Sequence, residues 1–180
     1  MDIKYAFSPF LQGRDIKQAR KRLGLTQQAF AELTGVSQKT IERWESSDKI
    51  TGPIIPLIRI LSEQPQLEKR YQVPEKKTPL RLYYYYRNEL CTIIDVDDQA
   101  RMVEIRNYTD FLQFRAFGIV EHPDYAQYEE FLESRCFPRT RDKMKIILKE
   151  MGLPFYDPFL IIEKTEGRMA EDDFWIRIER

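Results

Sequence analysis

The chemistry that this sequence offers most clearly lies in residues 37–44, where polar side chains surround two apolar ones, Ile41 and Trp44, at helical spacing. We expect Ile41 to be buried, which leaves Gln38, Lys39 and Arg43 on the other faces of a helix. Amide, ammonium and guanidinium groups that project from the start of a helix can hydrogen-bond to base edges in the major groove of duplex DNA. The segment therefore predicts a recognition helix.

Short helices with well-marked ends are predicted around this segment. Thr26 and Ser37 are good N-caps, because their hydroxyls can accept a hydrogen bond from a backbone N–H of the first helical turn. Gly35 suits the tight turn between two helices, where a positive φ is often required. The predicted helices are Asp15–Leu23, Gln27–Leu33, Gln38–Glu45, and one that begins near Pro53 and ends near Leu61. Two short helices joined by a glycine-containing turn have the geometry that enters a major groove.

The stretch from Asp15 to Leu61 resembles the Cro/CI-type, or XRE-type, helix-turn-helix, and within that group it is most similar to the MqsA-type antitoxin DNA-binding domain. The matching residues are Phe30-Ala31-Glu32-Leu33, Gly35-Val36-Ser37, Thr40, Trp44-Glu45 and Gly52-Pro53. The sequence departs from the family at Ser46-Ser47, where a glycine usually follows the Trp-Glu pair. The zinc-binding part of that antitoxin family is not visible here.

The resemblance implies double-stranded operator DNA as the partner and a role for each matching polar residue. The base readers that it implies are Gln38, Lys39 and Arg43. The phosphate-positioning residues that it implies are Gln27, Ser37 and Thr40. One recognition helix buries little surface, so we expect a homodimer on half-sites about one helical turn apart. The sequence does not show which surface mediates the dimer.

Charge and composition divide the chain into two parts. The net charge is zero, but residues 1–70 hold 12 Lys/Arg against 8 Asp/Glu (+4), and residues 71–180 hold 17 against 21 (−4). This asymmetry fits a DNA-binding domain followed by a domain with a different partner. We expect a helix-turn-helix domain over residues 1–65, a linker over 66–79 and a partner- or effector-binding domain over 80–180.

The fold class expected for the whole chain is α+β: an all-α first domain, then a small domain with an antiparallel sheet. Tyr-, Ile- and Val-rich segments predict the strands Leu80–Arg87, Cys91–Val96 and Met102–Asn107, extended by Phe111–Phe117, with a last strand at Phe174–Ile178. Apolar residues at helical spacing predict the helices Pro123–Arg135, Arg141–Met151 and Asp157–Thr165. In the run Tyr83–Tyr86, alternate tyrosines should face opposite sides of the sheet.

Other groups of reactive residues favour structural roles. The acidic groups Glu171-Asp172-Asp173 and Asp95/Asp97/Asp98 are better explained as solvated turns than as metal sites. Cys91 and Cys136 are expected in the core, and Cys136 with the only histidine, His122, lacks the pattern of a nucleophilic site. Basic residues also cluster around a helix start, at Arg135, Arg139, Arg141, Lys143 and Lys145. We therefore expect no catalytic residues, no metal and no cofactor.

Three functional hypotheses remain open. The first is a cytoplasmic antitoxin or autorepressor of a prokaryotic operon, whose second domain binds a protein partner such as a toxin. The second is an enzyme or toxin-like module that carries its own DNA-targeting domain, and the third is a ligand-sensing repressor. The region after residue 130 loosely resembles small domains of toxin–antitoxin and HipA-related operon proteins. The sequence contains no apolar run long enough for a membrane span and no signal peptide at its start.

Overall fold

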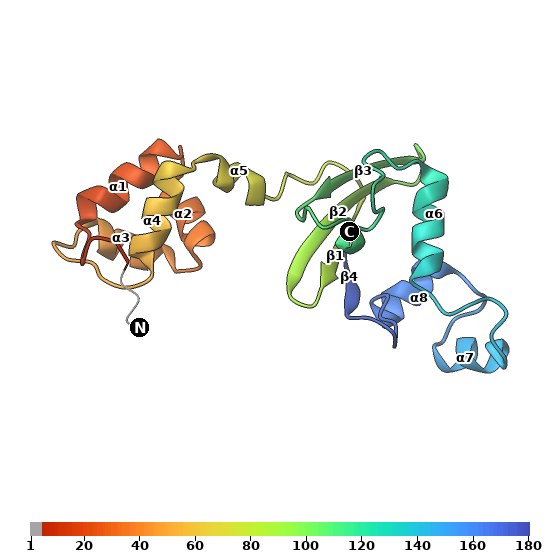
Figure 1. Ribbon diagram of the computed structural model, residues 1–180. Coiled ribbons are helices and arrows are strands. Elements are labelled where there is room, and N and C mark those ends of the chain that lie inside the picture. Colours follow the sequence, from red (N-terminus) through yellow and green to blue (C-terminus); the bar gives the residue numbers. More distant parts are fainter. Residues whose placement is uncertain (1–4) are drawn as a thin grey trace. The chain divides into compact units, whose positions relative to one another are not determined.

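A computed structural model describes residues 5–180 of the chain, so residues 1–4 of the predicted first domain lie outside the described residues. The chain divides into two units: the first ends at Val73 and the second is Pro74–Arg180 (Figure 1). The first unit is helical, and the second holds a four-stranded antiparallel sheet with helices. The predicted α+β class is confirmed.

The described part of the first unit folds around one apolar cluster of helices. Its helices are α1 (Gly13–Arg22), α2 (Gln27–Thr34), α3 (Gln38–Glu45), α4 (Ile54–Glu63) and α5 (Gln66–Tyr71). Ile16, Phe30 and Ile41 come from three different helices and are fully buried in this cluster. The first four helices lie where they were predicted, whereas α5 lies among residues that were predicted to be linker.

The local signals of the sequence act as expected at the ends of α2 and α3. The Thr26 hydroxyl accepts a hydrogen bond from the Ala29 amide at 3.1 Å, and the Ser37 hydroxyl accepts one from the Thr40 amide at 3.2 Å. Gly35 ends α2 with a φ of 69°, a conformation that costs other residues energy. The turn between the two helices is therefore determined by local sequence.

A glycine lets α1 approach the end of α3 closely. The Gly13 amide donates to the Ser47 carbonyl at 2.8 Å, and a Cβ atom on Gly13 would lie 2.3 Å from the Glu45 carbonyl oxygen. Because that neighbour is backbone, a side chain here would force the two helices apart. The contact fixes α3 relative to α1.

The second unit is built on a sheet in the order β3-β2-β1-β4, with every neighbouring pair antiparallel (Figure 1). Its strands are β1 (Leu80–Tyr86), β2 (Glu89–Asp97), β3 (Met102–Asn107) and β4 (Phe174–Glu179). Its helices are α6 (Tyr125–Ser134), α7 (Met144–Glu150) and α8 (Pro158–Thr165), with a 3-10 turn η1 (Leu112–Phe114). The sequence predicted all four strands and all three helices to within a few residues.

The two faces of the sheet differ in character. Leu80, Leu82 and Tyr84 of β1 point into an apolar core that also contains residues of α6, α7 and α8. Tyr83 and Tyr85 alternate with them in β1 and therefore point to the opposite face. The predicted alternation of the tyrosine run is confirmed.

The predicted strand Phe111–Phe117 is wrong. Part of that segment forms η1, and the Phe114 ring stacks on Tyr86 at 4.5 Å between ring centroids. The Ala116 amide donates to the Thr92 hydroxyl rather than to a neighbouring strand. Phe114 and Phe117 of this segment pack beneath the sheet, so an irregular backbone buries them better than a fifth strand would.

Two buried arginines tie loops to the sheet of the second unit. Arg81, which is 2% exposed, makes a bidentate pair with Asp95 at 2.6 and 2.7 Å and donates to the Pro74 and Glu75 carbonyls. The hydrogen bonds that Arg81 donates to Asp95 raise the pKa of Arg81 further above its ordinary value. Buried charges of this kind are tolerated only when their hydrogen bonds are satisfied.

The second of these arginines, Arg135, follows α6. Its guanidinium pairs with Asp172 at 2.7 and 2.9 Å and also donates to the Gly167 carbonyl. It thereby holds the segment before β4 against the end of α6.

Among the described residues, no helix is both long and apolar enough to cross a membrane.

Candidate nucleic-acid interface

Helix α3 has one buried face and one outer face. Ile41 is fully buried, and Trp44 is partly buried against the same apolar cluster. This packing turns Gln38, Lys39 and Arg43 outward, and all three are exposed. The residues named as base readers therefore share the solvent side of one short helix, and Trp44 has the core role that its spacing indicates.

The residues named as phosphate positioners lie in two environments. Ser37 and Thr40 stand at the start of α3, with their hydroxyl oxygens 2.9 Å apart. Ser37 is also the N-cap, a role that typically contributes about 1 kcal/mol to helix stability. Gln27, by contrast, is half-buried, and its side-chain amide donates to Glu45 at 2.9 Å.

The outer face of α3 is slightly hollowed. An open groove of about 480 Å³ is lined by Ser37, Lys39, Thr40, Glu42, Arg43 and Ser46. Neither Glu42 nor Ser46 was predicted from the sequence to contact DNA. Glu42 accepts a hydrogen bond from the Gln38 side chain at 3.0 Å, an i, i+4 contact that the spacing of the two residues could have indicated. A carboxylate at this position can also accept from cytosine N4.

A polar network behind this face holds the first three helices together. Arg20 of α1 pairs with Glu45 of α3 at 2.6 Å, and both side chains are largely buried, at 12% and 7% exposure. Arg20 also donates to the Leu25 carbonyl before α2, so each of the three helices is linked to the pair. Burial alone would raise the pKa of Glu45. The hydrogen bonds from Arg20 and Gln27 outweigh that effect and hold the pKa below its ordinary value of 4.5.

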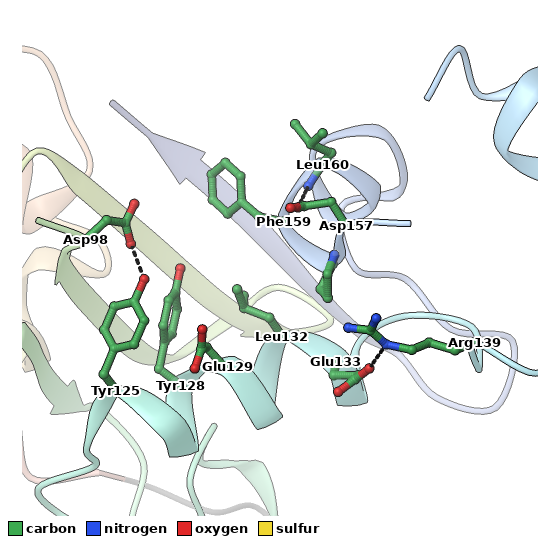
Figure 2. Close-up of a pocket in the computed structure, with 11 residues that line it drawn as sticks. Asp98, Tyr125, Tyr128, Glu129, Leu132, Glu133, Arg139, Asp157, Phe159 and Leu160 are labelled. Atoms are coloured by element: carbon green, nitrogen blue, oxygen red, sulfur yellow. Dashed lines mark hydrogen bonds and ion pairs between the residues drawn. The ribbon is translucent and has the colours of Figure 1, made fainter. Parts of the chain in front are cut away.

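The second unit contains an open pocket of about 620 Å³ between α6 and the start of α8 (Figure 2). Its lining combines aromatic side chains with four carboxylates and one arginine. It comprises Asp98, Tyr125, Tyr128, Glu129, Leu132, Glu133, Arg139, Asp157, Pro158, Phe159 and Leu160.

All four carboxylates at this pocket already have a partner, and Glu129 lies 3.6 Å from the Arg101 guanidinium. Asp98 accepts from the Tyr125 hydroxyl at 2.9 Å, and Asp157 caps α8 by accepting from the Leu160 amide (Figure 2). Glu133 pairs with Arg139 at the far side. Sequence reasoning missed this pocket, because its residues come from four separate segments.

Three of the other reactive residues named from the sequence are held in ion pairs with arginines. Asp95 pairs with Arg81, Asp172 with Arg135, and Asp173 with Arg87. Within residues 5–180, no three His, Cys, Asp or Glu side chains are grouped so as to hold a metal ion.

Both cysteines are buried and carry free thiols, as expected for core residues. Burial, followed by nearby negative charge, raises the pKa of Cys136 to about 12, so its thiol is protonated at neutral pH. A nucleophilic cysteine requires a lowered pKa. His122 lies exposed on the surface.

Comparison with known proteins finds one family model that covers this interface. The sequence model of a helix-turn-helix family matches residues 16–58, which run from α1 to α4. Neither the curated proteins nor the solved structures gave a match. Residues 16–58 are therefore a helix-turn-helix domain of the Cro/CI type, and this domain supports a DNA-binding transcriptional regulator.

Proposed function

We propose that this protein is a cytoplasmic, sequence-specific repressor that acts as a homodimer on the operator of its own operon, as an antitoxin or an autorepressor. The observation that carries the proposal is the outer face of α3, where Gln38, Lys39 and Arg43 are exposed together on a helix fixed by buried Ile41. Their side chains match the donors and acceptors that base edges present in the major groove.

The supporting residues of the interface have positioning roles in this proposal. Ser37 and Thr40 contact phosphates at the start of α3, where backbone N–H groups also favour an anion. Gln27 sets the position of α3 through its hydrogen bond to Glu45. The second N–H of its side-chain amide donates to a phosphate. Gln38 and Glu42, which hydrogen-bond each other without DNA, exchange that bond for contacts with bases.

We assign the second unit a binding role without catalysis. Its buried thiols are protonated, and three of its six candidate acidic residues are engaged with arginines. A protein partner such as a toxin fits the antitoxin form of the proposal. The loose resemblance of this region to toxin–antitoxin operon domains supports that choice.

The proposal predicts a selective defect for Arg43→Ala. We expect this variant to lose about 1–3 kcal/mol of binding free energy on the protein's own promoter, because one bidentate base contact disappears. Binding to a shuffled duplex of equal length should change much less. Fluorescence anisotropy on both duplexes at several salt concentrations measures the difference.

The matched control for this experiment is Arg59→Ala. Arg59 is an exposed arginine of α4 that pairs with Glu63, so its removal takes away the same charge from another surface. Equal weakening of Arg43→Ala on promoter and shuffled DNA would contradict a base-reading role for Arg43.

A second candidate is a ligand-sensing repressor, which the pocket beside α6 favours. The lining has four carboxylates against one arginine and includes the rings of Tyr125, Tyr128 and Phe159. That combination suits a cationic ligand with an apolar body, because aromatic faces attract cations. We expect an arylalkylamine such as tyramine to raise the melting temperature of the wild type but not of Glu129→Gln. An equal rise in the melting temperature of the wild type and of Glu129→Gln would show that this pocket is not the binding site.

A further inference from the structure

The two edge strands of the sheet, β3 and β4, differ in how far the chain itself occupies their outer backbone groups. At the β4 edge, the Ile176 amide donates to the Glu166 carbonyl at 2.7 Å. The Phe174 amide donates to Asp172 at 3.0 Å, and the Phe174 carbonyl accepts from Arg135 at 3.4 Å. Much of this edge is therefore occupied by the chain itself, in the way that proteins protect an outer strand.

The β3 edge has no such protection in the described part of the chain. The Tyr108 amide donates to the Cys91 carbonyl at 2.8 Å, which fixes the alternation of hydrogen-bonded pairs between β2 and β3. By that alternation, the backbone N–H and C=O groups of Val103, Ile105 and Asn107 point away from β2. No hydrogen bond to these outward groups occurs within residues 5–180. An open edge of this length is a template for pairing with another strand.

The side chains of β3 indicate which strand would pair with it. Val103 and Ile105 are half-buried and lie against the apolar core, whereas Glu104 and Arg106 lie on the opposite face. The strand therefore carries one negative and one positive residue symmetrically about Ile105. A second copy of the same strand, running antiparallel, presents these charges in reverse order.

We propose that two copies of this protein pair through β3, antiparallel, about a two-fold axis at Ile105. In this register the outward backbone groups of Ile105 meet those of Ile105 in the second copy, and those of Val103 meet those of Asn107. Glu104 then stands directly opposite Arg106 of the second copy, and the reverse pair forms on the other side of the axis. Opposite charges in directly opposed positions stabilise a strand pair.

The neighbouring registers are disfavoured by the same charges. Two copies of β3 can form backbone hydrogen bonds only in registers where the outward N–H and C=O groups of one copy face those of the other. The nearest alternatives therefore have their two-fold axis at Glu104 or at Arg106 instead of Ile105. The first shift places Glu104 opposite Glu104, and the second places Arg106 opposite Arg106, and like charges in these positions are destabilising. The Ile105 register also pairs the largest number of outward groups and joins the apolar faces of the two sheets.

This inference deepens the proposed function, and rests on it only for the requirement that the regulator be a dimer. The two-fold axis at Ile105 produces an isologous interface, which uses the same residues of both copies. A dimer of this kind carries two helix-turn-helix domains, as an operator with two half-sites requires.

Charge reversal on β3 tests the interface in the full-length protein. We expect the wild type to sediment as a dimer and Glu104→Arg to raise the dimer dissociation constant by about tenfold, because both charge pairs become repulsive. The double exchange Glu104→Arg with Arg106→Glu restores opposite charges and should restore the dimer. Glu130→Arg on the exposed side of α6 is the matched control and should leave the dimer unchanged.

A second variant tests the backbone pairing itself. Because the Ile105 amide points away from β2, Ile105→Pro leaves the ladder within the chain intact and removes a donor from the outer edge. We expect this variant to be monomeric, with the far-UV circular dichroism of the wild type. Amide hydrogen exchange should show that protection of residues 102–107 increases with protein concentration in the wild type but not in Ile105→Pro.

Three results would overturn the inference: a monomeric wild type, a dimer that survives both Glu104→Arg and Ile105→Pro, or a double exchange that fails to restore the dimer of a folded protein. The Arg43→Ala variant tests the proposed function separately from the dimer interface. That variant should remain a dimer while losing promoter binding, so DNA binding and dimer formation are measured independently.

Discussion

Replacing Arg81 with methionine is expected to lower the free energy of unfolding of the second unit by about 4 kcal/mol. Arg81 is 2% exposed and forms both hydrogen bonds of a bidentate pair with Asp95. Without it, the half-buried carboxylate keeps only the Thr78 hydroxyl at 3.3 Å, and the Pro74 and Glu75 carbonyls lose their donor. An unpartnered charge in a buried site accounts for most of the expected loss.

The two tryptophans allow the units to be followed separately. Trp44 lies in α3 of the first unit and Trp175 in β4 of the second, and the chain contains no others. Urea unfolding in a Trp44→Phe background therefore reports on the second unit. Arg87→Met is the matched control, since Arg87 pairs with Asp173 on the surface, where such pairs contribute little. If Arg81→Met and Arg87→Met lowered the free energy of unfolding equally, burial could not be the reason for the effect of Arg81→Met.

Glu45→Ala is expected to lower the free energy of unfolding of the first unit by about 3 kcal/mol. The substitution leaves the Arg20 guanidinium, which is 12% exposed, without its carboxylate, and it removes the acceptor of the Gln27 amide. Trp44 fluorescence in a Trp175→Phe background measures the loss. Glu63→Ala, which breaks the exposed pair with Arg59, should change the stability by less than about 0.5 kcal/mol.

The pH dependence of this effect identifies the charge as its cause. The pKa of folded Glu45 lies below its ordinary value of 4.5, so the pair contributes fully above that pH and its contribution is lost as the pH falls toward the folded pKa. The stability difference between wild type and Glu45→Ala should be constant near neutral pH and shrink below pH 4.5. A difference that stays constant down to strongly acidic pH would show that packing is responsible instead.

Local signals explain why the helix-turn-helix was predictable. Thr26, Ser37 and Gly35 set the ends of α2 and α3 through hydrogen bonds within a few residues of themselves. The i, i+3 spacing of Ile41 and Trp44 likewise predicted which side of α3 is buried, and hence that Arg43 is exposed. These features depend on short stretches of chain, which a sequence displays directly.

Features that depend on distant residues were not predictable. Glu45 matched a family motif, but nothing in the sequence indicated that Arg20 and Gln27 would converge on it. The same holds for Arg135, which the sequence placed in a basic run and the fold pairs with Asp172, 37 residues away. Long-range pairs arise from packing of whole elements, so spacing along the chain carries no sign of them.

The segment after β3 shows how tertiary packing overrides local propensity. The aromatic residues of 111–117 favour a strand, yet Phe114 and Phe117 are used to fill space beneath the sheet against Tyr86 and Phe131. A strand would present alternate residues to solvent, whereas the irregular path buries both rings more fully. The pocket beside α6 was missed for a related reason, since it exists only where separate elements meet.

Selection of binding sites from a random duplex library tests most directly whether α3 reads base pairs. The wild type should enrich one sequence with two related half-sites about one helical turn apart. Arg43→Ala should enrich the same sequence except for one position in each half-site, where the base preference disappears. Enrichment of no sequence by the wild type, or of an identical sequence by both proteins, would contradict the account.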